Sequence, residues 1–164
     1  MTKAASNTQF LKSVLTTIPA SEFGSKLVGV GVNILVKNAK NHAEQLQEVL
    51  GVEIIRAEDA FALVAAPNFG EPADEVPITS LFQIHADFTY HANSYLNLLP
   101  ENEARGIGVE LHLFECDPDK AAAKAEKHPD WTVLQAPTDK PHGVRETYLL
   151  DGHGYCWVAS CPLA

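Results

Sequence analysis

The chain has 164 residues, of which 46% are hydrophobic and 20% charged, so it can bury a core as one globular domain or two small fused halves. Twelve basic against 21 acidic residues give a formal net charge of -9, which argues against nucleic acid or an anionic membrane surface as the main partner. The longest apolar stretch, residues 27–36, is far shorter than the roughly 20 residues of a membrane-spanning helix. Three cysteines without CxxC spacing and no signal-peptide core predict a cytoplasmic protein whose partner is a small molecule or another protein.

Hydrophobic periodicity predicts the elements of the first half. Apolar residues at helical spacing indicate helices, and Asn38 and Gly51 are typical start and stop residues for the second of them. Polar residues at alternate positions predict that one face of the last strand meets solvent or a polar cavity. In chain order, the predicted elements are a helix over residues 7–18, a strand over 27–37, a helix over 39–50, a hairpin over 52–56 and 61–66, a loop over 67–77 and a strand over 78–90.

The second half repeats the first. The strand sequence of residues 29–36 has a close echo in residues 106–113, and a helix follows in both copies, the second capped by Asp117 with Pro118 in its first turn. Three strand-like runs follow that helix, as they follow the first. The sequence therefore predicts an α+β fold of two tandem βαβββ modules whose curved mixed sheets form a barrel-like cavity. The predicted ranges are 1–26 for an N-terminal helix and linker, 27–90 for the first module, 91–105 for a connection and 106–164 for the second module.

The segment from Pro141 to Trp157, PHGVRETYLLDGHGYCW, carries a specific resemblance. It is similar to the strand–turn–strand hairpin of the vicinal oxygen chelate superfamily, the group of glyoxalases, bleomycin-resistance proteins and extradiol dioxygenases, although Gly152 replaces the proline of the family's turn. The resemblance covers the chain from about Leu27 to its end. It implies a small-molecule site between paired modules, and it implies a homodimer.

The resemblance also implies a divalent metal held by His or Glu side chains from the first and last strands of each module, which would stabilise an enolate as a Lewis acid. The family's ligand positions align here with Gly31, Gly108 and Val158, which cannot bind metal. A shifted site could combine Glu110 and His112 with His85 or Asp87, and would suit zinc, nickel, manganese or iron. The other interpretation makes Glu110 a hydrogen-bond acceptor for backbone or Arg145 and His112 a polar wall residue.

Further candidate site residues come from alternation and residue type. Glu110, Glu146 and His142 are the candidate catalytic residues, with Glu146 facing inward and Arg145 outward, and His142 acting as an acid or base or only capping a strand. Aromatic side chains could line a binding site or belong to the core. His42 and His128 are expected on solvated helix surfaces, and Cys116 is interpreted as structural. The candidate ligand-binding residues are His85, Asp87, Tyr90, His112, Tyr148 and Trp157.

Two hypotheses about function follow. The first is an enzyme, a lyase, isomerase or dioxygenase with a non-standard metal site around Glu110, His85 and Glu146. The second is a metal-free protein that binds and sequesters a cationic or flat small molecule, as in the bleomycin-resistance branch, and the acidic net charge favours it.

Overall fold

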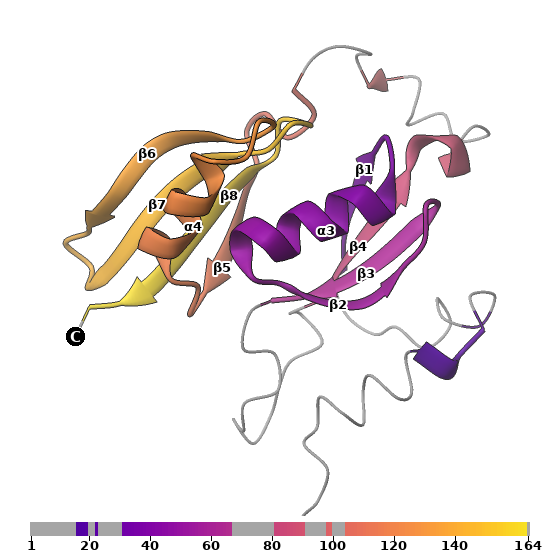
Figure 1. The fold of residues 1–164 in the computed structure, drawn as a ribbon, viewed down its shortest axis with the longest axis horizontal. Coiled ribbons are helices and arrows are strands. Elements are labelled where there is room, and N and C mark those ends of the chain that lie inside the picture. Colours follow the sequence, from indigo (N-terminus) through magenta and orange to yellow (C-terminus); the bar gives the residue numbers. More distant parts are fainter. Residues whose placement is uncertain are drawn as a thin grey trace, which may run out of the picture.

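The computed structural model shows two modules with the same order of elements (Figure 1). It describes residues 16–19, 22, 31–66, 81–90, 98–99 and 104–163. The first module consists of β1 (Val32–Val36), α3 (Ala39–Leu50), β2 (Glu53–Ala57), β3 (Phe61–Ala65), β4 (Leu81–Ala86) and the 3-10 helix η3 (Asp87–Tyr90). The second consists of β5 (Glu110–Phe114), α4 (Pro118–Ala125), β6 (Thr132–Asp139), β7 (Val144–Leu150) and β8 (Cys156–Pro162). The predicted repeat of βαβββ units is confirmed.

Each module forms a four-stranded mixed sheet with the same strand order. The orders are β1-β4-β3-β2 and β5-β8-β7-β6. The first strand of each module runs parallel to its last strand, and the other neighbours are antiparallel. Among the described residues the two sheets remain separate and do not join into a closed barrel. The α+β class is therefore confirmed, with an arrangement more open than a barrel.

Both helices begin where their sequences predict, and α3 also ends at its predicted glycine. Asn38 accepts a hydrogen bond from the Asn41 amide at the start of α3, and Gly51 ends that helix with a φ of 72°. Asp117 accepts from the amides of Asp119 and Lys120 at the start of α4. The buried faces of both helices carry largely aliphatic side chains, several of them alanines. Such side chains let the helices pack closely on their sheets.

The last strand of the first module is shorter than predicted. Alternation predicted a strand to Tyr90, but β4 ends at Ala86 and residues 87–90 form η3. The Thr89 hydroxyl donates to the Ala86 carbonyl over 2.7 Å, and Asp87 is bound by Arg105. These contacts turn the chain away from the sheet, which a period-two pattern alone does not reveal.

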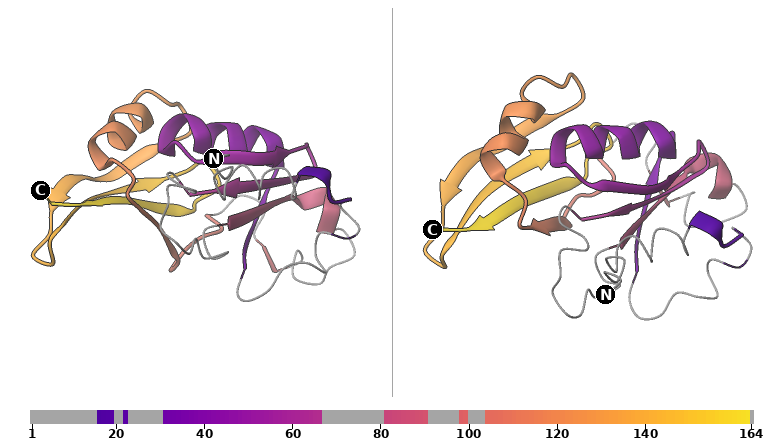
Figure 2. Two further views of the ribbon diagram at one scale, coloured as in Figure 1. Left: turned by 90° about the horizontal axis from the view of Figure 1, so that it is seen from below. Right: turned by 60° about the horizontal axis from the view of Figure 1, so that its bottom comes forward.

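The two modules share one core. α3 and α4 lie on the same side of the two sheets and contact each other (Figures 1 and 2). A single cluster of buried side chains includes residues from both modules, and the rings of Phe82 and Trp157 meet edge to face with their centroids 5.8 Å apart. Burial of such large side chains is the main stabilising contribution, at roughly 1.5–3 kcal/mol for each. The other face of the second sheet has no helix on it among the described elements, whereas that face of the first sheet carries a smaller buried cluster of Ile55, Leu63 and Ala65, against which Ile18 packs.

Several predictions fall outside this description. Most of the helix predicted over 7–18, the loop over 67–77 and most of the connection over 91–105 lie outside the described residues, so the predicted module boundaries stay predictions. Residues 16 and 17, in the described part of the first of these, are helical. In the described part of the chain, no helix has the length and hydropathy needed to span a membrane.

Candidate functional site

Polar and aromatic side chains gather on the helix-free face of the second sheet. Leu111 and Leu113 of β5 face the core, so their neighbours Glu110, His112 and Phe114 face the other way. The strand register sets these residues beside residues of β8 and β7 in two rows across the face. One row contains His112, Val158 and Tyr148, and the next contains Phe114, Ser160 and Glu146.

Glu146 is a buried carboxylate on this face, only 6% exposed. Its nearest polar partners are the Tyr148 hydroxyl at 3.4 Å, His142 Nε2 at 3.5 Å and Lys140 Nζ at 3.8 Å. These distances are long for hydrogen bonds, whose donor and acceptor normally lie 2.7–3.2 Å apart for N–H donors and closer for hydroxyls. Burial, and then the negative charges of Glu146 and Glu110, raise the pKa of Tyr148, so its phenol stays a neutral donor.

Glu110 and His112 form a second polar pair on the same face. Glu110 Oε2 and His112 Nε2 lie 3.2 Å apart, and the His112 ring stacks on Phe114 with centroids 6.0 Å apart. Burial, and then the charge of Glu110, raise the pKa of Cys156 nearby. The structure thus brings together five predicted site residues from β5, β7 and the loop before it: Glu110, His112, His142, Glu146 and Tyr148.

Arg145 does not join them. Its guanidinium lies on the helix side, where it binds Asp119 of α4 in two hydrogen bonds of 2.7 and 2.9 Å and Asp139 at 2.7 Å. The interpretation that Glu110 accepts from Arg145 is therefore wrong, because the two side chains lie on opposite faces of the sheet. Alternation along β7 puts Arg145 on one face and Glu146 on the other, as expected.

His85 and Tyr90 belong to the first sheet. Ile84 and Ala86 of β4 are fully buried, and between them His85 contacts Phe61 and Tyr90 edge to face, with ring centroids 4.9 and 5.3 Å apart. Burial lowers the pKa of His85. Asn33 donates to the Tyr90 hydroxyl over 2.6 Å, so these polar groups already have partners within the first module.

Asp87 and Trp157 have structural roles. Arg105 holds Asp87 in two hydrogen bonds of 2.6 and 2.8 Å and also donates to the Leu35 carbonyl, which ties η3 to β1. Trp157 has no exposed surface, and its Nε1 donates to Asp151 over 2.8 Å. It faces the core, so the prediction that Trp157 contacts a ligand does not fit its position. Alternation along β8 already places Trp157 and Val158 on opposite faces of the sheet, so the sequence could have shown that Trp157 faces the core.

The residues present do not fit the metal site that the resemblance implies. Val158 is fully buried and without a donor atom, and Gly108 takes a positive φ of 82° in the turn before β5. A Cβ at Gly31 would lie 3.3 Å from the Gln83 side chain. Within the described ranges, no three His, Cys, Asp or Glu residues lie close enough to hold a metal ion, so the shifted site of Glu110, His112 and His85 or Asp87 is not assembled.

Sequence reasoning missed a buried polar group between the modules, which we call the boundary cluster: His42, Asp151 and His153. His42 is 1% exposed, not on a solvated surface as expected. Its Nε2 lies 3.5 Å from Asp151 Oδ2, and its ring meets the edge of His153 at 4.9 Å between centroids. Burial lowers the pKa of His42 to about 4, and burial with the neighbouring His42 lowers that of His153 to about 4. The sequence contained a sign of this burial, because His42 lies on the apolar stripe of α3 beside Ala43 and Leu46.

Comparisons with known proteins agree on the fold. No family model matches the sequence, and no curated protein matches it. Among solved structures, a glyoxalase/bleomycin resistance protein/dioxygenase family enzyme from Burkholderia phytofirmans PsJN is similar with a TM-score of 0.55 and 17% identity, over 80% of this chain and 96% of that one. A glyoxalase-related enzyme from Fulvimarina pelagi has a TM-score of 0.54 and 11% identity, over 82% and 88%.

A glyoxalase/bleomycin resistance protein/dioxygenase from Nocardioides is similar over 96% of this chain and 93% of its own, with a TM-score of 0.51 and 16% identity. At these identities the likeness concerns the fold. The chain therefore has the fold of these glyoxalase, bleomycin-resistance and dioxygenase proteins.

Proposed function

We propose that this protein binds a small molecule on the helix-free face of its second sheet, with Glu146 as the polar anchor and without a resident metal ion. The observation that carries the proposal is that Glu146 is buried but has only long polar contacts. A buried carboxylate is stable only when hydrogen bonds or opposite charges compensate for its lost hydration. The contacts of Glu146 to Tyr148, His142 and Lys140, at 3.4 to 3.8 Å, are too long to supply this fully. A ligand that donates a hydrogen bond would complete the set.

The surroundings of Glu146 favour a flat ligand with a positive charge. The stacked rings of His112, in the adjacent row, and Phe114, in the row of Glu146, offer a planar apolar surface, and Phe114 is 70% exposed. Glu110 adds a second carboxylate, and the net charge of -9 raises the local concentration of cations. Lys140, whose Nζ lies 5.1 Å from the centre of the Tyr148 ring, is the cation that such a ligand would displace from this face.

A second candidate function is metal-assisted lyase, isomerase or dioxygenase chemistry. The observation that favours it is the Glu110–His112 pair, whose oxygen and nitrogen, 3.2 Å apart, are donors of the kind that zinc, nickel, manganese and iron accept. Two protein donors are fewer than the three that catalytic zinc sites keep. The metal-free proposal therefore has the stronger support.

Binding of aromatic cations tests the proposal. We expect a panel of flat aromatic cations, beginning with ethidium, to raise the melting temperature, and chelator to leave that rise unchanged. Glu146→Gln removes the charge while keeping the shape, so we expect binding about tenfold weaker or more, in line with a charge-assisted hydrogen bond of roughly 1.5–3 kcal/mol. Glu126→Gln, at an exposed position just after α4, is the matched control and should bind as the wild type does.

Two results would contradict the proposal. Equal affinity of wild type and Glu146→Gln would place the site elsewhere. Binding that disappears with chelator, together with about one divalent ion per chain by elemental analysis, would favour the metal-assisted candidate, and Glu110→Gln should then lose the ion.

A further inference from the structure

Two of the three cysteines lie opposite each other at the end of the second sheet. The regular register of β5 with β8 ends at Phe114 and Ser160. Glu115 then takes a left-handed φ of 59°, and the Cys116 amide donates to the Ser160 carbonyl over 3.0 Å. In a parallel ladder, an amide donates to the residue that precedes its partner, so Cys116 is paired with Cys161 and Glu115 is one extra, bulged residue. The return bond is absent because residue 162 is a proline, which has no N–H.

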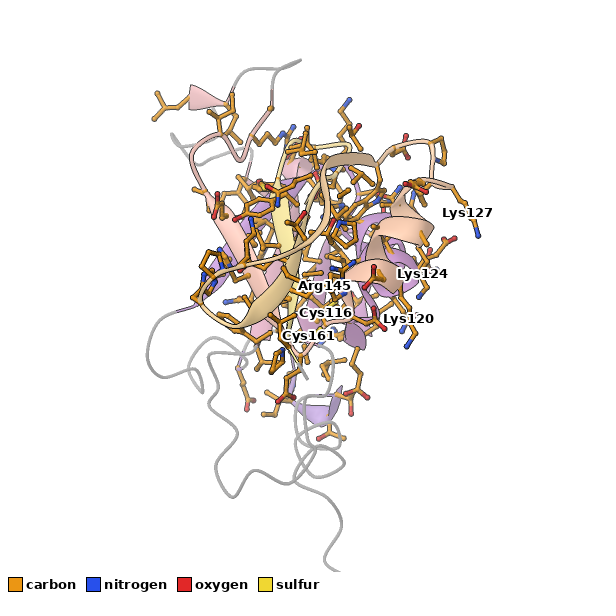
Figure 3. The ribbon with its side chains drawn as sticks, turned by 90° about the vertical axis from the view of Figure 1, so that its left-hand side faces the viewer. Cys116, Lys120, Lys124, Lys127, Arg145 and Cys161 are labelled. Atoms are coloured by element: carbon orange, nitrogen blue, oxygen red, sulfur yellow. The ribbon has the colours of Figure 1, made fainter. Side chains whose placement is uncertain are left out.

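The two side chains project to the same side of the sheet. Trp157 and Ala159 of β8 belong to the core, and Cys161 has the same parity. Cys116 also belongs to the core cluster on this side. Figure 3 shows the labelled side chains of Cys116 and Cys161 next to each other. Neighbouring strands lie roughly 4.7–4.9 Å apart, which is within the range of Cα separations that a disulfide spans, about 4.4–6.8 Å.

The two thiols differ in exposure, and burial shifts the pKa of Cys116. Cys116 is 4% exposed, whereas Cys161 is half-buried and so the more accessible of the two. Burial, and then the charge of Asp117, raise the pKa of Cys116 to about 11. Its thiol is therefore protonated at neutral pH, even though a helix begins just after it. Because the thiolate is the reactive form, an oxidant would not react first at Cys116.

We propose that Cys161 and Cys116 form a thiol-oxidation site, in which a hydroperoxide oxidises Cys161 and Cys116 then closes a disulfide. The Cys161 thiolate attacks the peroxide, the O–O bond breaks, and Cys161 becomes a sulfenic acid while water or an alcohol leaves. Cys116 sulfur then attacks the Cys161 sulfur, and the displaced hydroxide leaves as water with the proton of Cys116. Two thiols lose two electrons and the peroxide gains them.

The cross-link would change a contact between the modules. In the reduced protein, the Cys116 thiol donates to the carbonyl of Leu50, the last residue of α3, over 3.3 Å. A disulfide sulfur has no proton to donate, so oxidation ends this hydrogen bond. The oxidation state of the second module is thereby coupled to its contact with the first.

Hydrogen peroxide tests the proposal on the full-length chain. We expect the Cys156→Ser variant, which keeps only the proposed pair, to lose the mass of two hydrogen atoms under mild peroxide and to regain it with dithiothreitol. Cys156→Ser combined with Cys161→Ser should show no such loss. Cys156→Ser combined with Cys116→Ser should instead give a dimedone adduct at Cys161, because the sulfenic acid has no partner.

Peptide mapping of the oxidised wild-type chain tests the same cross-link and does not depend on whether a variant folds. Chymotrypsin cleavage after Trp157 separates Cys156 from Cys161, and we expect a cross-linked peptide pair containing Cys116 and Cys161. A cross-link between Cys116 and Cys156, or oxidation of Cys161 to sulfinic acid with no cross-linked peptide, would overturn the proposal.

Discussion

At the scale of single residues, Asp151 is the acceptor that organises the turn before β8. Its Oδ1 accepts from the amides of His153 and Tyr155 at 2.8 and 3.0 Å, and its Oδ2 accepts from Trp157 Nε1 at 2.8 Å. Burial raises the pKa of Asp151 even though these hydrogen bonds oppose the shift. The sequence showed the aspartate within the family's hairpin pattern. It did not show that the carboxylate points into the core beside His42.

Replacement of Asp151 should be strongly destabilising. Asp151→Ala leaves the buried Trp157 Nε1 and the partly buried amides of His153 and Tyr155 without their acceptor. A buried donor left unpaired costs about 1–3 kcal/mol, so we expect the free energy of unfolding to fall by about 3 kcal/mol or more. Urea denaturation measures it. Asp139→Ala, which removes an exposed carboxylate from the Arg145 pair, is the control and should stay close to wild type. A loss as small as that of the control would mean that water replaces the carboxylate.

At the scale of elements, the turn between β7 and β8 fits closely against the segment that leads into β5. Gly154 has a φ of 84°, and a Cβ added there would lie 2.4 Å from Cα and Cβ of Ala104. The Arg105 amide donates to the His153 carbonyl over 2.9 Å, and Gly106 donates to the Gly154 carbonyl over 3.2 Å. Glycine is needed here for both its backbone angle and its small size, because no larger side chain fits the contact.

A pair of glycine substitutions separates these two requirements. Gly154→Ala should lower the free energy of unfolding by about 3 kcal/mol, because left-handed strain and a clash with backbone add together. Gly143→Ala is the matched control, since Gly143 has a φ of 87° but no atom within 4 Å of an added Cβ, and we expect a loss of about 1 kcal/mol. Thermal or urea unfolding compares them. Equal losses would show that Ala104 moves aside at little cost.

At the scale of the whole molecule, polar contacts join the two modules beside their shared core. The Tyr155 hydroxyl donates to the Leu35 carbonyl over 3.0 Å and accepts from the Leu35 amide over 3.1 Å. The Lys37 amide donates over 3.2 Å to Nε2 of His153, a member of the boundary cluster. The homodimer and the cytoplasmic location stay predictions. The paired modules within one chain are what the structure establishes.

The boundary cluster makes stability sensitive to acid. His42 and His153 have a pKa of about 4 in the folded protein against 6.5 for an exposed histidine, so the unfolded chain binds their protons first. Stability from these groups is complete above about pH 6.5 and falls as the pH drops toward 4. The raised pKa of Asp151 acts in the opposite direction, and the Arg105–Asp87 pair faces the same cluster. We expect His42 alone to account for about 2 kcal/mol of the free energy of unfolding lost between pH 7 and pH 5.

Urea unfolding at pH 7, 6 and 5 measures this loss. His42→Gln removes one of the two titrating rings, so its stability should fall less steeply with acid than that of the wild type. His128→Gln, at a half-buried position after α4, should follow the wild-type slope. Parallel slopes for His42→Gln and wild type would mean that His42 does not titrate in this range.

The sequence by itself determined the α+β class, the repeat of two βαβββ units, both helix caps and the hairpin that ends the chain, because periodicity, capping residues and turn glycines act over a few neighbouring residues. Strand parity in the second module also set Glu110, His112, Glu146 and Tyr148 on one face, since it needs no knowledge of distant contacts. Only the tertiary structure decided that Arg145 binds Asp119, that Arg105 holds Asp87, and that His42 is buried against Asp151 and His153. These contacts join residues of different segments that are far apart in the chain, and they depend on how the helices, strands and modules pack against one another.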